Sequence, residues 1–329
     1  MAYTAIDNPE LYFQAKLYTG SGGTQSITLD GDEDMQPDLI WIKSRADTNP
    51  HTVVDAVRGA TKVIWTNVSS AEGTYTDEVT AFDSDGFTLG ASSNAYANEN
   101  TETHVAWCWK ESATAGFDII SYTGDGSDRD LSHSLSASPE FIIIKQRSGS
   151  QDWSTQSTAL GLANYVILND TNASAGTSGA LVDAVSSSTI SVDDNSYVNG
   201  NTSTYIGYLW RSVQGFSAMG KYTGNGNADG AFVYTGFKPA MVLQKMSSSA
   251  GYSWHIFDNK RDTYNPIDKR LFPDATDGDS TGTNIDFVSN GFKFRSTATG
   301  YNGSGNTFIY MAFAEAPFVN SNGVPCNAR

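Results

Sequence analysis

The chain has 329 residues, and its 36 acidic and 20 basic side chains give a formal net charge of −16. This balance opposes binding to nucleic acids and to anionic membranes, because affinity for a polyanion depends on clustered Lys and Arg. No apolar run approaches the ~20 residues of a membrane-spanning helix. The many glycines, and the Ser, Thr and Asn between short apolar runs, predict an all-β protein whose strands are joined by turns.

The first residues predict a short tail. Residues 1–12 have neither the basic start nor the apolar centre of a signal peptide, so we expect synthesis in the cytoplasm of the producing host cell. Asn8 followed by Pro9 is typical of the start of a helix, with a capping side chain and a proline in the first turn. The sequence therefore predicts a short helix before Gln14.

One sequence frame then recurs three times: a proline, an apolar run, and a lysine six residues after the proline. The frame occupies residues 37–43, 139–145 and 239–245. Large and β-branched apolar residues, opened by a proline that only the start of a strand tolerates, predict a buried strand in each copy. A Tyr-Thr-Gly segment precedes each frame, and these segments are 104 and 100 residues apart.

Further strand signals follow each frame in the same order. The first copy has a hairpin signal at Asp85-Gly86, where glycine supplies a positive φ, and each copy ends in a long strand, at 103–109, 204–210 and 307–313. A period of about 100 residues is the size of a complete β-sandwich domain. We therefore predict three tandem antiparallel β-sandwich modules. They span 15–113, 114–214 and 215–329, after a tail at 1–14.

Several segments of the chain, taken together, resemble a known protein module. They are residues 18–20, 37–43, 57–62 (Val-Arg-Gly-Ala-Thr-Lys), 82–90, 105–110 and 312–318. Together they resemble an uncharacterised β-sandwich module, of the jelly-roll or concanavalin A-like kind, that recurs in tail-fibre-like and other structural proteins of bacteriophages, marine phages especially. The resemblance implies a virion component at the tail and no catalytic residue. The second copy departs from it, because residues 186–189 replace the Asp-Gly turn and no Arg-Gly follows its third strand.

Acidic loops are candidate calcium sites, because alternating aspartates around a glycine can supply several oxygen ligands. The candidate ligands are Asp30, Asp32, Asp34, Asp274, Asp277 and Asp279, and a further loop holds Asp125, Asp128 and Asp130. The alternative is solvated turns in an acidic protein, and the lack of a full EF-hand spacing favours it.

Aromatic residues near Asn and Asp are candidates for glycan binding, because sugars are recognised by flat apolar faces beside amides and carboxylates. The candidates are Trp65, Tyr75, Trp153, Trp254, Tyr264 and Tyr301. The alternative is that they belong to the core, as most aromatics in β proteins do.

Catalytic signals are weak. Glu140 and Glu315 lie at expected strand edges, but no paired-carboxylate motif of a glycosidase surrounds them. Four histidines and no Gly-x-Ser-x-Gly give no basis for a nucleophilic triad. The two cysteines form no metal framework, and we expect no cofactor apart from the candidate calcium.

The leading hypothesis is therefore a non-enzymatic phage virion protein, a tail-fibre or tail-tip component that attaches to host-surface glycans. We expect the chain to form a homotrimer and to contact other tail proteins. Three modules in one chain could instead form a ring with pseudo-threefold symmetry. A capsid decoration or tail scaffold protein with only protein partners is the second hypothesis. A polysaccharide-degrading tail enzyme is the third.

Overall fold

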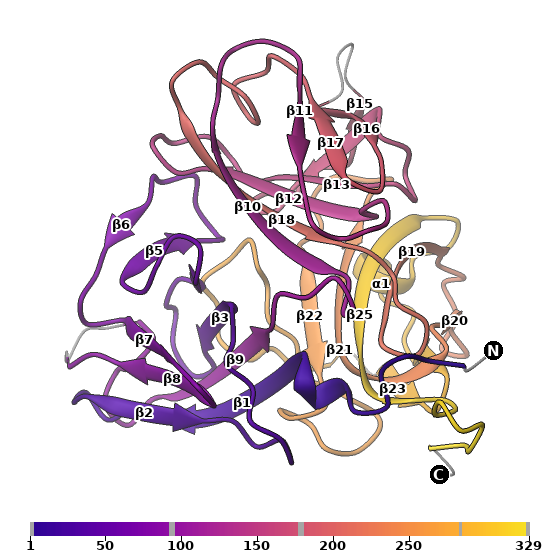
Figure 1. Cartoon of the computed structure of the whole chain (residues 1–329). Helices are drawn as coiled ribbons and strands as arrows, with labels where there is room; N and C mark the ends of the chain where they lie inside the picture. The colour runs from indigo at the N-terminus through magenta and orange to yellow at the C-terminus, as the bar shows by residue number, and fades with distance from the viewer. Residues whose placement is uncertain (1–2, 92–95, 177–180, 283–284, 327–329) are drawn as a thin grey trace.

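The computed structural model describes residues 3–91, 96–176, 181–282 and 285–326, which fold almost entirely as antiparallel β-sheet (Figure 1). The all-β prediction is confirmed. The predicted N-terminal helix is wrong in extent, because the segment forms only a 3-10 turn, η1 (Pro9–Leu11). Asn8 caps this turn as predicted, accepting a hydrogen bond of 3.1 Å from the Glu10 N–H. A strand begins directly after this turn. Its residues Phe13 and Ala15 both point into the core, and this spacing of two residues fits a strand and not a helix.

Module 1, the indigo to purple part of Figure 1, is a sandwich of a large and a small antiparallel sheet. The large sheet has the order β1 (Phe13–Thr19), β9 (Thr103–Trp109), β3 (Leu39–Ser44), β4 (Thr52–Asp55), β5 (Lys62–Trp65) and β6 (Gly73–Thr74). The small sheet has the order β2 (Gln25–Thr28), β8 (Gly86–Leu89) and β7 (Val79–Asp83). Gly86 has a φ of +114°, so the Asp85-Gly86 turn joins β7 and β8 as its sequence predicts.

Module 2, in magenta, repeats this arrangement. Its large sheet has the order β10 (Phe117–Thr123), β18 (Thr204–Trp210), β12 (Phe141–Gln146), β13 (Ser154–Ser157), β14 (Asn164–Ile167) and β15 (Ala175–Gly176). Its small sheet has the order β11 (Arg129–Ser132), β17 (Thr189–Val192) and β16 (Val182–Val185).

Module 3, in orange to yellow, keeps the plan with fewer strands. Its large sheet has the order β19 (Ser217–Thr223), β25 (Thr307–Pro317), β21 (Phe237–Met246) and β22 (His255–Asp258). Its small sheet has the order β20 (Phe232–Tyr234), β24 (Gly291–Phe294) and β23 (Ile285–Val288), and a short helix α1 (Thr299–Asn302) precedes β25. An isolated bridge between Ile256 and Leu271 stands where the other modules have a fifth strand.

Each large sheet is buried on both faces. In β9, Trp107 and Trp109 point to a core shared with the other modules, whereas Ala106 and Cys108 point to the small sheet of module 1. Successive side chains of a strand lie on opposite faces, so a strand covered on both sides must be apolar throughout. This explains the uninterrupted apolar runs of the repeated frame.

The three modules surround the shared core and close into a ring with pseudo-threefold symmetry (Figure 1). Equivalent backbone hydrogen bonds join each module to the next. The Glu72 N–H donates to the Arg147 carbonyl (2.9 Å), the Ser174 N–H to Ser247 (2.8 Å) and the Asp279 N–H to Arg45 (2.7 Å). Because the third bond returns from module 3 to module 1, the chain forms a closed arrangement and not a row of independent modules.

Candidate functional site

A surface groove of about 870 Å³ lies at the base of module 3, between the N-terminal segment, the end of β25, the loop after β22 and strand β23. A smaller hollow of about 290 Å³ adjoins it and shares Glu10, Lys238, Asn259, Thr263 and Glu315 with it. The larger volume lies within the ~300–1,000 Å³ typical of small-ligand pockets. The two hollows together form an elongated site, which we call the module 3 groove.

Two long strands build one wall of the groove. β21 and β25 pair beyond the length of their counterparts in the other modules, as far as Phe237 opposite Pro317. The register shifts at Pro239, which has no N–H to give to a ladder and is therefore confined to strand edges and bulges. This extension presents Lys238 and Glu315 side by side at the groove.

The N-terminal segment forms another wall. The Tyr3 hydroxyl donates to the Gly236 carbonyl (2.8 Å), and the Asp7 carboxylate accepts hydrogen bonds from the backbone N–H and hydroxyl of Ser321. These two bonds from Ser321 lower the pKa of Asp7. The N-terminal segment is thereby bound both to the residue before β21 and to the chain after β25.

The polar groups of the groove are partly engaged with one another. Glu315 binds the Lys238 ammonium (2.7 Å) and the Asn259 amide (2.8 Å). Asp262 accepts hydrogen bonds from the backbone N–H groups of Asp268 (2.8 Å) and Lys269 (2.7 Å). Burial acts to raise the pKa of Asp262, but these bonds and the Lys269 ammonium outweigh it and hold the pKa below its usual value.

The Tyr264 side chain extends into solvent beside these groups. It is 84% exposed, although it lies in the lining of the groove. Its neighbour Asn265 is fixed by two hydrogen bonds with the backbone of Phe287 (2.8 and 2.9 Å). An exposed ring on a fixed loop beside carboxylates and amides can bind the apolar face of a polar ligand.

The six aromatic residues predicted to bind glycans differ in how far they are buried. Tyr264 lines the groove, but Trp153, Trp254 and Tyr301 are only 1%, 0% and 2% exposed, so their prediction as glycan-binding surfaces is wrong. The indole N–H groups of Trp153 and Trp254 donate to the Trp65 and Ile167 carbonyls of the preceding module (3.0 and 2.8 Å).

Trp65 and Tyr75, the remaining aromatic candidates, are half-buried and pack on each other, with ring centroids 5.2 Å apart. They belong to module 1 and are absent from the lining of the module 3 groove. The structure therefore brings only one of the six predicted aromatic residues to this groove.

The predicted calcium ligands do not converge. Asp30 pairs with Lys16, and Asp279 binds Arg45 (2.9 Å) and Arg261 (2.8 Å). Asp274 accepts a hydrogen bond of 2.9 Å from the backbone N–H of Trp254. Among the described residues, one group of three acidic side chains is close enough to share an ion, and it consists of Asp128, Asp193 and Asp194. Asp128 belongs to the further acidic loop named from the sequence, but none of the six main candidate ligands is in the group.

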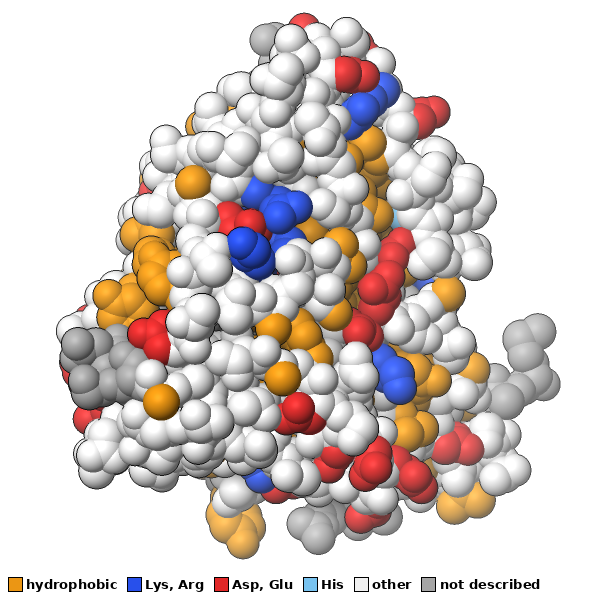
Figure 2. All heavy atoms as spheres, turned by 60° about the vertical axis from the view of Figure 1, so that its left-hand side comes forward, with side chains coloured by type: hydrophobic (Ala, Val, Ile, Leu, Met, Phe, Trp, Pro, Cys, Tyr) orange, Lys and Arg blue, Asp and Glu red, His pale blue; other side chains and the backbone are white. Residues whose placement is uncertain are grey.

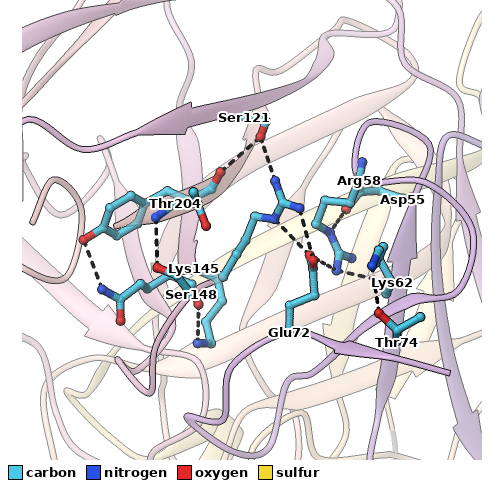
Figure 3. Close-up of polar contacts among 12 residues, drawn as sticks. Asp55, Arg58, Lys62, Glu72, Thr74, Ser121, Lys145, Ser148 and Thr204 are labelled. Carbon is cyan, nitrogen blue, oxygen red and sulfur yellow. Dashed lines mark hydrogen bonds and ion pairs between the residues drawn. The ribbon is translucent and has the colours of Figure 1, made fainter. Parts of the chain in front are cut away.

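Charged side chains also gather where modules 1 and 2 meet. Figure 2 shows a group of basic and acidic side chains near the middle of one face, and further charged side chains towards its right-hand and lower edges. Figure 3 shows Arg58 bound to Asp55 and to Glu72 (3.4 Å) at this interface. Glu72 also binds Arg147 of module 2 (2.9 Å). Arg58 belongs to the Val-Arg-Gly motif, and its side chain is fully buried. This motif is therefore a structural element of the interface.

The other two interfaces between modules have the same geometry, but their residues at the equivalent positions are not all the same. Asp258, Arg261 and Asp279 repeat the cluster between modules 3 and 1, where the Trp107 indole N–H donates to Asp258 (3.2 Å). Between modules 2 and 3 the repeat positions hold Ser157, Leu160, Ser174 and Met311. Two interfaces are ionic, whereas the third has no charge at these positions.

The carboxyl groups of Glu111 and Asp118 lie next to each other at the joint between modules 1 and 2. Burial, followed by hydrogen bonding to Asp118, raises the pKa of Glu111 to about 8. The Glu111 backbone N–H also donates to Asp38 (2.7 Å). None of these three residues is in the lining of the module 3 groove.

Sequence reasoning missed most of the groove. Asp7, Glu10, Asn259 and Asp262 line it but were not among the predicted ligands, because they come from segments far apart in the chain. The sequence indicates Glu315 only as a carboxylate at a strand edge. The available signal was local: Tyr264 lies among Asn259, Asp262 and Asn265.

The fold defines an all-β protein of three sandwich modules, with a polar surface groove on the third. A family model described as "Domain of unknown function (DUF7483)" matches residues 8–317, and the chain belongs to this family. None of the curated proteins matches the chain. No helix among the described residues is long and apolar enough to cross a membrane.

Proposed function

We propose that the protein is a non-enzymatic recognition protein that binds a glycan in the module 3 groove. The observation that carries the proposal is the lining of this groove, where the exposed Tyr264 ring stands beside carboxylates and amides. Hydroxyl groups of a sugar suit such hydrogen-bonding partners, and the apolar face of a sugar ring suits an aromatic side chain.

The carboxyl groups of the groove favour binding over hydrolysis. A glycosidase needs one carboxyl group held protonated as a general acid, which requires a raised pKa. Among the groove residues, Asp7 and Asp262 have shifted pKa values, and both are lowered. The proposal therefore assigns the groove no catalytic residue.

The place of the protein in a bacteriophage particle is part of the same proposal. It rests on the resemblance of the first copy to phage tail-fibre-like modules and on the acidic composition. In this role the chain is a tail-fibre or tail-tip component, made in the host cytoplasm and held by other tail proteins. The homotrimer predicted from the sequence stays a prediction. Immunogold labelling of intact particles tests the location, and unlabelled particles that contain the folded protein inside would contradict it.

Glycan binding is tested with the purified full chain on an array of bacterial surface glycans. We expect Tyr264→Ala to weaken binding by about tenfold or more, since tenfold corresponds to ~1.4 kcal/mol. Phe232→Ala is the matched control, because Phe232 is also an exposed aromatic of module 3 but is not in the groove lining. If the folded chain binds no glycan, or if both variants weaken binding equally, the proposal is wrong.

A further inference from the structure

The module 3 groove carries an excess of negative charge. Four carboxylates line it, from Asp7, Glu10, Asp262 and Glu315, against the two ammonium groups of Lys238 and Lys260. The chain as a whole has a net charge of −16, which adds to the negative field. An anionic ligand would meet repulsion there, whereas a cationic ligand would be attracted.

Most of these charges already have partners. Lys238 neutralises Glu315, Lys269 binds Asp262 (3.2 Å), and Ser321 binds Asp7. The Glu10 side chain differs, because it has no hydrogen bond or ion pair within the described part of the chain. Glu10 also lines both the main groove and the adjoining hollow. It is therefore the carboxylate available to a ligand.

The backbone holds Glu10 in a defined position. The Asn8 side chain accepts a hydrogen bond from the Glu10 N–H (3.1 Å), and the Gln14 amide donates to the Glu10 carbonyl (2.9 Å). Gln14 is itself fixed, since its side-chain oxygen accepts a bond from the Gly31 N–H (2.9 Å). A site whose backbone is fixed before binding loses less conformational entropy when a ligand arrives.

A second acceptor beside the groove lacks a partner. Asn259 donates its amide N–H to Glu315, but its buried Oδ1 has no hydrogen-bond partner in the described part of the chain. Because this oxygen is closed to solvent, it does not receive a ligand itself, and the Glu10 carboxylate is the acceptor that the groove presents. An ammonium group offers that carboxylate three donors and a positive charge.

Building on the proposed function, we propose that the groove selects saccharides that carry a protonated amine. Glu10 binds the ammonium group, and Tyr264 packs against a sugar ring. Acetylation of the amine removes the charge and leaves Glu10 without its ion pair. Sugars that carry carboxylates are repelled by the excess of acidic side chains. The Lys260 ammonium, which has no ion pair among the residues that the structure describes, lies at the smaller hollow and does not reverse this balance.

The test compares three probes on the full chain by calorimetric titration: a glucosamine tetrasaccharide, its N-acetylated counterpart and a tetragalacturonate. We expect the amine probe to bind at least about tenfold more tightly than the acetylated probe, as a charge-assisted hydrogen bond is roughly twice as strong as a neutral one. Binding of the amine probe should weaken as salt is added, because the partly exposed ion pair is screened. The uronate should bind most weakly.

Variants assign the selectivity to Glu10. Glu10→Gln keeps the size of the side chain but removes its charge, so the difference between the amine and acetylated probes should disappear. Glu33→Gln is the matched control, because Glu33 is an exposed glutamate of module 1 outside the groove lining. Circular dichroism verifies that each variant is folded.

The outcomes separate this inference from the proposed function. If Tyr264→Ala abolishes saccharide binding but the amine probe is not preferred, or if Glu10→Gln leaves the preference unchanged, the inference is wrong and the proposed function stands. If the uronate binds most tightly, Lys260 and not Glu10 directs recognition, and the inference is also wrong. If neither the probes nor any arrayed glycan binds, both are wrong.

Discussion

At the scale of single residues, buried charges fix the contacts between modules. The side chains of Asp55 and Arg58 are both fully buried, and the Tyr208 hydroxyl of module 2 donates to Asp55 (2.7 Å). A buried charge is tolerated only where a partner of opposite sign and further hydrogen bonds compensate for the loss of water. Arg58 meets this condition, because it also donates to the Lys62 and Val53 carbonyls (both 3.0 Å).

Arg58→Ala should therefore destabilise the protein strongly. It leaves Asp55 buried without its cation, which typically costs about 3–5 kcal/mol. The combined change of Asp55→Ser, Arg58→Leu and Tyr208→Met copies three of the four residues found between modules 2 and 3. Glu72 keeps its partner Arg147 (2.9 Å), so the combined variant should recover much of the lost stability. Urea unfolding followed by tryptophan fluorescence measures both effects. A loss below ~1 kcal/mol for Arg58→Ala would contradict the assignment of a structural ion pair.

At the scale of elements, the lysine that ends each repeated frame connects the end of a strand to a following loop. Lys43 donates to the Ser44 and Asp47 carbonyls (2.7 and 2.9 Å), and Lys245 donates to the Tyr252 carbonyl. Lys145 binds the Gln146 carbonyl (2.7 Å) and reaches the Ser69 carbonyl of module 1 (3.0 Å). Burial lowers the pKa of all three lysines to about 8.

This shift predicts how stability depends on pH. Between a folded-state pKa of about 8 and an unfolded value of 10.5, the unfolded chain binds more protons at Lys145. Stability should therefore rise with pH across this window, by at most ~1.4 kcal/mol per pH unit for one group. The free energy of unfolding of the wild type, minus that of Lys145→Met, should increase from pH 8 to pH 10. If the free energies of unfolding of the wild type and of Lys145→Met change with pH in parallel, this assignment is wrong. Lys62→Met is the control variant, because Lys62 is only half-buried.

The elements were more predictable from sequence than the site. Apolar runs, a positive-φ turn at Gly86 and a repeated period are local signals, so they indicated the strands and the β-sandwich character. Trp153 and Trp254 were misassigned because the carbonyls that bind them lie 88 and 87 residues away in sequence. Both residues occupy the same position of the repeat, immediately before β13 and β22, and this shared position was the available signal of a structural role.

The groove was not predictable for a similar reason. Glu10 and Glu315 lie near opposite ends of the chain, and Asn259 lies in a loop after β22. Only the closure of the ring, which places the N-terminal segment against module 3, brings them together. Strand patterns indicate how each sandwich forms, but they contain no information on which module edges meet.

At the scale of the whole molecule, the shared core makes the modules depend on one another. Each module contributes tryptophan or other large side chains to it, including Trp109, Trp210 and Phe313. The rings of Trp109 and Trp210 lie 6.4 Å apart, and those of Trp109 and Phe313 lie 5.7 Å apart. Separation of one module would expose these faces to water, and each buried aromatic or aliphatic side chain stabilises by about 1.5–3 kcal/mol.

We therefore expect the full chain to unfold in one cooperative transition. Independent modules would give up to three transitions, whereas a common core gives a calorimetric enthalpy equal to the van't Hoff enthalpy. Trp109→Ala should lower the temperature of the whole transition, because Trp109 contacts side chains of both other modules and a large cavity costs about 3–5 kcal/mol. Phe87→Ala is the informative comparison, since Phe87 lies in the core of module 1 alone. If Trp109→Ala separates the melting curve into distinct transitions, the modules retain stability of their own; if the curve shifts as a whole for both variants, the ring is the folding unit.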